Sequence, residues 1–117
     1  MNCLFCKIAA GNSPAKIFYD DKEIMIFADI MPRAEIHLLV CPKAHYKTLL
    51  DIPDDLLMKV INRIRVLATE LGLEDNFRLI LNNGAHSGQI VEHLHFHFMS
   101  NASNVDLRFK SQSIGKS

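Results

Sequence analysis

The sequence predicts one domain of the α+β class, in which one long helix covers a five-stranded antiparallel sheet. Five short segments alternate apolar and polar residues or are rich in β-branched and aromatic residues, and short loops join most of them. One longer segment repeats apolar residues at the period of a helix. A chain of 117 residues is long enough for one hydrophobic core. This combination is typical of a sheet packed against a helix on one face.

Turn residues or proline bound the expected strands. The first two strands flank a short polar turn and therefore predict a hairpin. Pro42 ends the third strand because it has no N–H to donate to a neighbour. In chain order the five strands are Ala15–Tyr19, Glu23–Asp29, Ile36–Cys41, Phe77–Asn82 and Ile90–Met99.

The long helix is expected between the third and fourth strands. Asp51 is suited to the N-cap and Pro53 to the first turn. Gly72 is suited to the left-handed position that ends a helix. A shorter helix is expected around Leu4–Ala10, ended by Gly11. The apolar stripe that should face the core consists of Leu57, Val60, Ile61, Ile64, Leu67, Ala68 and Leu71.

Composition restricts the classes of function. Thirteen basic residues balance thirteen acidic ones, so no overall field attracts nucleic acid or an anionic membrane. No apolar stretch has the length of a membrane span, and the first residues lack the pattern of a secretory signal. Three cysteines without an export signal indicate thiols in a reducing compartment. We therefore expect a cytoplasmic protein with neither a nucleic-acid nor a membrane partner.

The segment HLHFHF at residues 93–98 alternates three histidines with three apolar residues. In a strand, His93, His95 and His97 would project from one face and their neighbours from the other. At a rise of ~3.3 Å per residue the outer two lie about 13 Å apart, so the three cannot share one metal ion. Nucleophilic or phosphate-binding chemistry is one interpretation. The alternatives are polar filler on an exposed strand and a metal site shared by two neighbouring histidines.

The segment NNGAHSGQ at residues 82–89 lies directly before the histidines. Gly84 and Gly88 permit backbone conformations in which N–H groups face an anion. The Asn and Gln amides add further donors. Most glycine-containing loops are simply turns. Because this one leads into three imidazoles, it indicates a cradle for a phosphate oxyanion.

Over residues 3–99 the chain resembles the histidine triad family of nucleotide-binding hydrolases and transferases, and within it the adenosine phosphoramidase-like branch. The resemblance rests on the triad HLHFHFM and on three blocks in order, which are CLFCKIAAGNSPAKIFYDD, IFADIMPRAEIHLLVCPKAH and NNGAHSGQIVEHLHFHFM. It implies a homodimer in which two five-stranded sheets join into one of ten strands. It also implies a bound purine nucleoside monophosphate in each protomer.

The resemblance further implies the reaction and the residues that carry it. His95 would attack the α-phosphorus of a nucleoside 5′-phosphoramidate or related nucleotidyl conjugate, and water would then release the nucleoside monophosphate. His97 would contact the phosphate oxygens, and His37 matches a further active-site histidine. The nucleotide-binding residues would be Asn82, Gly88, Gln89 and Ile90 at the phosphate, Asp29 at the ribose hydroxyls, and Phe5, Ile8, Phe27 and Ile30 at the base.

The pair Cys3-x-x-Cys6 suggests redox or metal chemistry in a cytoplasmic chain. Two thiolates need two more ligands to close a tetrahedral zinc site. The resemblance supplies them as His45 and His93, which implies a structural zinc ion. The alternative is two idle thiols beside two ordinary histidines. If His93 holds zinc, only the other two triad histidines remain for catalysis.

Two positions depart from the family pattern. Ile90 stands where many members carry Ser or Thr, and Met99-Ser100-Asn101 replaces a Gly-Arg pair. A dinucleoside polyphosphate hydrolase, a nucleotide-binding regulatory module with little activity, and a zinc-stabilised interaction protein are therefore kept as alternatives. We expect residues 1–101 to form the domain and residues 102–117 to be a C-terminal tail of the same domain, part of it disordered.

Overall fold

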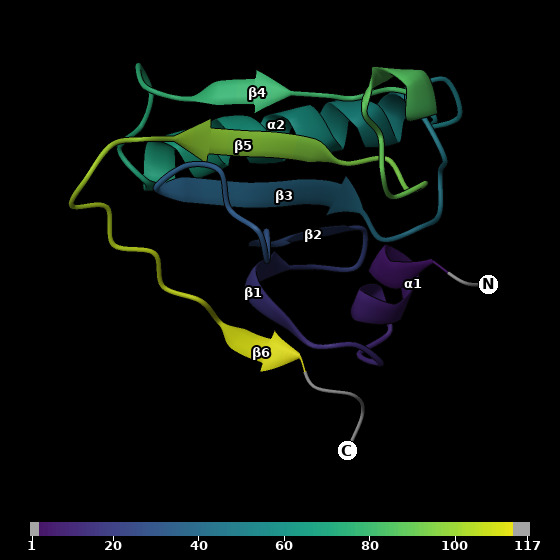
Figure 1. The fold of residues 1–117 in the computed structure, drawn as a ribbon, viewed down its shortest axis with the longest axis horizontal. Helices are drawn as coiled ribbons and strands as arrows, with labels where there is room; N and C mark the ends of the chain where they lie inside the picture. Colours follow the sequence, from purple (N-terminus) through teal and green to yellow (C-terminus); the bar gives the residue numbers. More distant parts are fainter. Residues whose placement is uncertain (1–2, 114–117) are drawn as a thin grey trace.

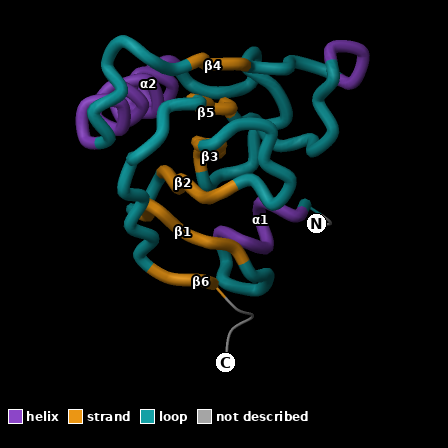
Figure 2. The backbone as a smooth tube through the Cα atoms, turned by 60° about the vertical axis from the view of Figure 1, so that its left-hand side comes forward, coloured by secondary structure: helices purple, strands orange, loops and turns teal. Residues whose placement is uncertain are grey.

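The computed structural model describes residues 3–113, which form a six-stranded antiparallel sheet with a helix on each face (Figure 1, Figure 2). The strand order is β4-β5-β3-β2-β1-β6. The elements are α1 (Leu4–Ala9), β1 (Ala15–Asp20), β2 (Ile24–Ala28), β3 (Ile36–Pro42), α2 (Asp54–Glu70), β4 (Arg78–Ile80), the short turn η1 (Ala85–Ser87), β5 (Phe96–Ser100) and β6 (Ser111–Ser113). The predicted α+β class, with one long and one short helix, is confirmed.

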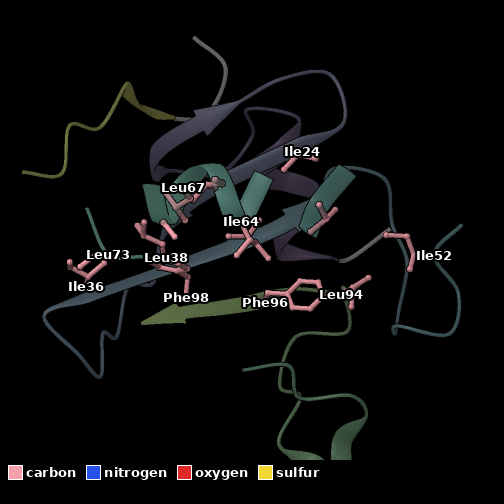
Figure 3. Close-up of a cluster of buried hydrophobic side chains, with 14 residues drawn as sticks. Ile24, Ile36, Leu38, Ile52, Ile64, Leu67, Leu73, Leu94, Phe96 and Phe98 are labelled. Atoms are coloured by element: carbon pink, nitrogen blue, oxygen red, sulfur yellow. The ribbon is translucent and has the colours of Figure 1, made fainter. Parts of the chain in front are cut away.

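The main core lies between α2 and the sheet (Figure 3). Ile64 and Leu67 of the helix stripe pack in one cluster with Leu38 of β3 and Phe98 of β5. Each such side chain contributes about 1.5–3 kcal/mol when it is fully removed from water. The helical period of apolar residues therefore identified the buried face of α2 correctly.

The ends of α2 differ in how well they were predicted. Asp51 was expected at the N-cap, but this prediction is wrong, because Pro53 holds that position. The Asp51 carboxylate instead accepts from the backbone N–H of Thr48 at 3.1 Å, which closes a turn before the helix. At the other end Gly72 has a φ of +69°, as predicted for the residue that terminates the helix.

A second, smaller core covers the opposite face of the sheet, where α1 lies. Phe5 and Ile8 of α1 pack there with Phe27 of β2 and with Leu39 of β3. The Cys3 thiol accepts the backbone N–H of Cys6 at 3.4 Å and so caps α1. This face of the sheet carries the candidate site.

The last two predicted strands are shorter than the sequence pattern indicated. β4 covers residues 78–80 rather than 77–82, and β5 begins at Phe96 rather than at Ile90. Before β5 the backbone bonds elsewhere, because Leu94 donates its N–H to the carbonyl of Tyr46 at 2.7 Å instead of joining the ladder. The alternation of side chains still holds, since Leu94, Phe96 and Phe98 all enter the main core.

The C-terminal segment forms a sixth strand that the sequence pattern did not reveal. β6 pairs with β1, with Ser113 opposite Ala15. Val105, Leu107 and Phe109 of the preceding segment pack against the main core on the α2 side. The expected disorder concerns in part residues 114–117, which lie outside the described residues. Within residues 3–113, neither α-helix has the length and apolar character needed to cross a membrane.

Candidate active site and metal centre

The side chain of His95 is buried just before β5 and is held by one short hydrogen bond. It is 7% exposed, and its Nδ1 lies 2.7 Å from the carbonyl oxygen of His93. Because a carbonyl only accepts, Nδ1 carries the proton and Nε2 keeps its lone pair. Burial lowers the pKa of His95, so the ring is neutral at pH 7. Its chemistry is therefore that of a nucleophile.

His37, His97 and Asp29 form an imidazole–carboxylate cluster on β3, β5 and the residue after β2. Nε2 of His37 lies 2.9 Å from Nδ1 of His97 and 3.3 Å from the Asp29 carboxylate. The His97 and His95 rings are 5.0 Å apart. β3 and β5 bring these groups together because Leu39 pairs with His97.

The proton positions in this cluster follow from one backbone contact. The N–H of Arg33 donates to Nδ1 of His37 at 3.1 Å, so this nitrogen has the lone pair and Nε2 carries the proton. Nε2–H of His37 then faces Nδ1 of His97, which accepts it at 2.9 Å. The remaining proton of neutral His97 must therefore be on Nε2. In this tautomer Nε2 of His97 can donate a hydrogen bond to a bound group.

Both imidazoles of this cluster are neutral near pH 7. Burial, together with the charges of His95, His37 and Arg33, lowers the pKa of His97 to about 4. Burial also lowers the pKa of His37, although Asp29 opposes this shift. The 3.3 Å contact between Nε2 of His37 and the Asp29 carboxylate therefore involves a neutral ring and is not an ion pair.

Cys3, Cys6, His45 and His93 form a thiol–imidazole cluster between α1 and the start of β5. All four ligand atoms lie within 4.8 Å of one another. Nδ1 of His93 is 3.3 Å from the Cys3 sulfur, and Nδ1 of His45 is 3.4 Å from the Cys6 sulfur. The structure thus brings together all four residues that the sequence resemblance selected as metal ligands.

The ring of His93 has the tautomer that a metal ligand needs. Its Nε2 lies 2.7 Å from the carbonyl oxygen of Pro42, so Nε2 carries the proton. Nδ1 therefore directs its lone pair at the two thiols. A ligating histidine whose other nitrogen donates to a carbonyl is usual in metal sites. The donor set and this orientation fit a closed four-ligand site for a soft divalent ion such as zinc.

The loop of residues 82–91 is arranged differently from the expected cradle. The N–H of Gly88 donates to Ala85, and the N–H of Gln89 donates to Gly84, both at 3.1 Å. In this structure both N–H groups are thus used within the loop, and the part of Gly88 and Gln89 in binding a phosphate stays a prediction. Within residues 3–113, no hydrogen bond uses the N–H of Ile90, whose side chain is 92% exposed.

Asn82 follows directly on the strand that pairs with the triad segment. It lies two residues after Ile80, the last residue of β4, which pairs with His97. The loop folds back over this position, because a Cβ atom on Gly88 would be 3.8 Å from the Asn82 side chain. The loop and the histidines therefore belong to one site.

The four residues expected at a nucleotide base do not all lie together. Phe5, Ile8 and Phe27 are buried in the second core, where the Phe5 and Phe27 rings meet edge to face at 5.2 Å. Phe5 also meets the His95 ring at 5.0 Å. Ile30 is 84% exposed at the start of the loop between β2 and β3. The structure thus places three of them on the sheet face that carries the candidate site and leaves Ile30 outside the core.

Two groups that shape the site escaped the sequence reasoning. The Arg33 N–H sets the tautomer of His37, and the Pro42 carbonyl sets that of His93. Backbone groups have no residue-type signature, so the sequence pattern does not reveal them. The one available signal was that Pro32-Arg33 occupies the turn just before the strand that carries His37.

Three alternating histidines beside β5, backed by an antiparallel sheet, define a protein of the histidine triad class. The sequence profile of the HIT domain matches residues 10–104, and the chain therefore belongs to the HIT domain family. The chain is 43% identical over 101 residues to Protein HitA of Neisseria gonorrhoeae, covering 84% of this chain and 94% of that protein. It is 35% identical over 105 residues to adenosine 5′-monophosphoramidase HNT1 of Candida albicans, covering 84% and 69%.

Solved structures agree with this assignment. A HIT family hydrolase from Legionella pneumophila superposes with a TM-score of 0.81 at 42% identity, covering 87% of this chain and 95% of that one. A Zn-bound histidine triad family protein from Mycobacterium smegmatis superposes with a TM-score of 0.74 at 34% identity, covering 93% and 81%. The fold and the family are thus established by the sequence and by the structure.

Proposed function

We propose that this protein hydrolyses nucleoside 5′-phosphoramidates or related nucleotidyl conjugates at the α-phosphorus, through a nucleotidyl-histidine formed on His95. The observation that carries this proposal is the hydrogen bond from Nδ1 of His95 to the carbonyl of His93 at 2.7 Å. It leaves a neutral ring with its Nε2 lone pair available for attack. The similarity to a named adenosine 5′-monophosphoramidase supports the substrate class.

In the first step, Nε2 of His95 forms a bond to the α-phosphorus, and the bond from phosphorus to the leaving amine breaks. The amine takes up one proton as it departs. In the second step, water attacks the same phosphorus, the His95–phosphorus bond breaks, and the nucleoside monophosphate leaves. The sum is one conjugate plus one water giving one nucleoside monophosphate and one amine. Covalent catalysis divides one difficult displacement into two easier ones.

The imidazole–carboxylate cluster would stabilise the phosphate during both steps. His97, whose remaining proton is on Nε2, would donate to a non-bridging oxygen, and His37 keeps this tautomer in place. Donors that are already oriented where charge develops give the largest electrostatic benefit. Asn82 and the N–H of Ile90 would add donors at the phosphate. Asp29 would accept from the ribose hydroxyls.

The thiol–imidazole cluster would hold one structural zinc ion. Cys3, Cys6, His45 and His93 would be its ligands, and the Zn-bound relative of this family supports the choice of metal. The ion would link α1, through Cys3 and Cys6, to the segment before β5, through His93. Because four protein ligands complete a tetrahedral shell, this site is suited to structure rather than to water activation.

The open edge of the sheet at β4 is the surface through which we expect a homodimer. β4 and β6 are the two outer strands, and the β4 edge exposes Phe77 at 36% and Leu79 at 41%. Apolar side chains on an unpaired edge favour pairing with a second copy. This pairing would join two six-stranded sheets into one of twelve strands, two more than the resemblance implied, because β6 adds one strand to each chain. Sedimentation velocity tests it, and Leu79→Lys should lower the mass to that of one chain.

The decisive experiment follows turnover and covalent labelling together. The wild-type protein is incubated with adenosine 5′-phosphoramidate, an acyl adenylate and a dinucleoside polyphosphate, and intact mass is recorded in acid-quenched samples. We expect release of AMP from the first two and a mass increase of one adenylyl group. His95→Asn should lose turnover by at least about 10⁴-fold, as removal of a covalent nucleophile does.

Binding separates a catalytic role for His95 from a structural one. His95→Asn should still bind AMP within about threefold of the wild type, because the phosphate donors remain. Preferred cleavage of the dinucleoside polyphosphate would replace the proposed substrate with the alternative one. Binding of AMP by the wild type without turnover or adduct on any substrate would identify a nucleotide-binding module instead.

A further inference from the structure

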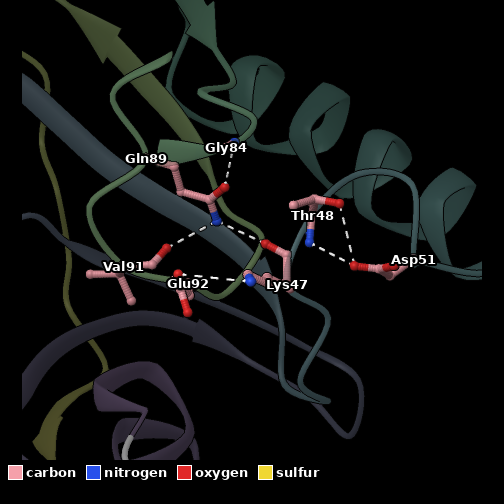
Figure 4. Close-up of polar contacts among 7 residues, drawn as sticks. All are labelled: Lys47, Thr48, Asp51, Gly84, Gln89, Val91 and Glu92. Atoms are coloured by element: carbon pink, nitrogen blue, oxygen red, sulfur yellow. Dashed lines mark hydrogen bonds and ion pairs between the residues drawn. The ribbon is translucent and has the colours of Figure 1, made fainter. Parts of the chain in front are cut away.

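The side chain of Gln89 is buried and bonds three separate backbone positions (Figure 4). It is 8% exposed. Its Oε1 accepts the N–H of Gly84 at 2.7 Å, and its Nε2 donates to the carbonyls of Lys47 at 2.8 Å and Val91 at 3.0 Å. Gly84 and Val91 lie at the two ends of the loop beside the triad. Lys47 lies on the segment between β3 and α2.

Two further hydrogen bonds join the same two segments. The Asn83 side chain accepts the N–H of Leu49 at 2.7 Å. The N–H of Leu94 donates to the carbonyl of Tyr46 at 2.7 Å. Residues 46–49 therefore run along the loop and its exit, directly after the proposed metal ligand His45. Of the hydrogen-bonding groups of Gln89, Asn83 and Leu94, only the Gln89 side chain bonds both ends of the loop.

The conformation of this loop depends on few hydrogen bonds, because most of the loop lies outside the helices and strands. Its N–H groups from Ser87 to Gln89 bond only within the loop itself. Without the Gln89 amide, the Gly84 N–H and the Lys47 carbonyl would lose these hydrogen bonds, whereas the Val91 carbonyl would still accept the N–H of His93 at 2.8 Å. Removing one partner of a hydrogen bond destabilises the arrangement that the bond held. The same loop brings Gly88 next to Asn82, which lies two residues after the strand residue that pairs with His97.

We propose that Gln89 is a positioning residue for the reaction: its side-chain amide fixes the loop of residues 84–91 against residues 46–49 and so aligns the α-phosphate with Nε2 of His95. In this role the amide does not bind the phosphate itself. The inference rests on the proposed function and deepens it. Loss of alignment by about 1 Å can cost 10²-fold in rate with little loss of binding.

Gln89→Glu provides a test that a merely structural residue would not satisfy. The carboxylate accepts from Gly84 but cannot donate to the carbonyls of Lys47 and Val91, whereas the protonated acid donates to one of them. We expect the kcat of this variant to be about 100-fold below wild type at pH 8. The ratio of variant to wild-type kcat should recover at least about tenfold by pH 5.5. KM should change by less than about threefold throughout.

Two companion variants make the result specific. Gln89→Met removes every hydrogen bond, so its low kcat ratio should stay flat with pH. Asn62→Asp makes the same amide-to-acid change on an exposed face of α2, where the amide only accepts from Arg65, and should not alter kcat. The titratable groups adjacent to the three bonded positions are the exposed Lys47, His86 and Glu92, and the ratio to wild type cancels their contribution.

The outcomes distinguish this inference from the proposed function. A wild-type protein without turnover would reject the proposed function. A working wild type with a pH-independent Gln89→Glu ratio, or with Gln89→Met within about twofold of its kcat, would overturn the positioning role. Amide hydrogen exchange adds a readout without turnover: protection at residues 84–91 should fall in Gln89→Met, and unchanged protection would contradict the inference.

Discussion

Two clusters on the same face of the sheet contain similar residue types and yet suit different chemistry. The thiol–imidazole cluster and the imidazole–carboxylate cluster each bring potential metal ligands within 4.8 Å. What separates them is the partner of the second nitrogen of one histidine. In the first, Nε2 of His93 donates to the Pro42 carbonyl, so Nδ1 offers a lone pair to a cation. In the second, Nδ1 of His37 accepts from the Arg33 N–H, so Nε2 offers a proton.

This difference shows that a group of ligand atoms is not by itself a metal site. A neutral histidine cannot coordinate through a nitrogen that carries a proton. For His37 to bind a metal through Nε2, its proton would have to move to Nδ1, where the Arg33 N–H already points. The hydrogen bonds around each ring therefore suit the first cluster to the proposed metal and the second to the proposed contact with a phosphate. The comparison can be tested by disturbing one cluster at a time.

The largest expected effect is the loss of zinc from Cys3→Ser. Structural zinc sites with two thiolates contribute apparent free energies on the order of 10 kcal/mol. We expect about one zinc per chain in the wild type and nearly none in Cys3→Ser, together with a marked fall in the unfolding midpoint. Atomic absorption and thermal denaturation measure both. Cys41→Ala is the matched control, because this buried cysteine is outside the cluster and its loss should leave zinc unchanged.

A smaller effect is expected from pH on the imidazole–carboxylate cluster. The native pKa of His97 is about 4, whereas an unfolded histidine has a pKa of about 6.5. The native state thus binds fewer protons between these values. The stabilisation is fully present above pH 6.5, falls progressively between pH 6.5 and pH 4, and is gone below pH 4. A shift of this size corresponds to about 3 kcal/mol.

Urea denaturation at several pH values measures this contribution. The free energy of unfolding of the wild type should fall more steeply between pH 7 and pH 4.5 than that of His97→Asn. Both proteins keep the thiol–imidazole cluster, so its protonation contributes equally to the two curves. Parallel curves for the two proteins would show that His97 titrates normally in the native state.

The parts of the molecule that were predictable are those encoded by local periodicity. The stripe on α2 and the alternation of residues 93–98 follow from side-chain direction alone, so both were predicted correctly. The β6 pairing was not, because a three-residue strand such as Ser111–Ser113 has no apolar pattern to mark it. The early end of the β5 ladder was missed because Leu94 bonds to the distant Tyr46.

The candidate site also contains features that could be predicted from the sequence and features that could not. The residues of the thiol–imidazole cluster were predictable from a resemblance in which residue type is the signal. The hydrogen bonds of the Gln89 side chain and the Gly88 N–H were not, because each of these groups can bond either a ligand or the protein itself. In this structure both bond backbone groups of the protein. The tautomers of His37 and His93 were likewise beyond reach, because the Arg33 N–H and the Pro42 carbonyl determine them.

The smallest of these effects, and the one that separates the clusters most directly, is expected from His37→Asn. This change removes the donor to His97 without touching any of the four proposed zinc ligands. If the ring only orients His97, kcat should fall about 10- to 100-fold, equivalent to about 1.4–2.7 kcal/mol of transition-state stabilisation. Zinc content should stay at the wild-type value, and no second equivalent of zinc should bind to the wild type. Turnover assays and metal analysis on the same preparation decide the matter. A variant that loses zinc but keeps its kcat would reverse the assignment of the two clusters, because His37 would then be supporting the metal and not the phosphate.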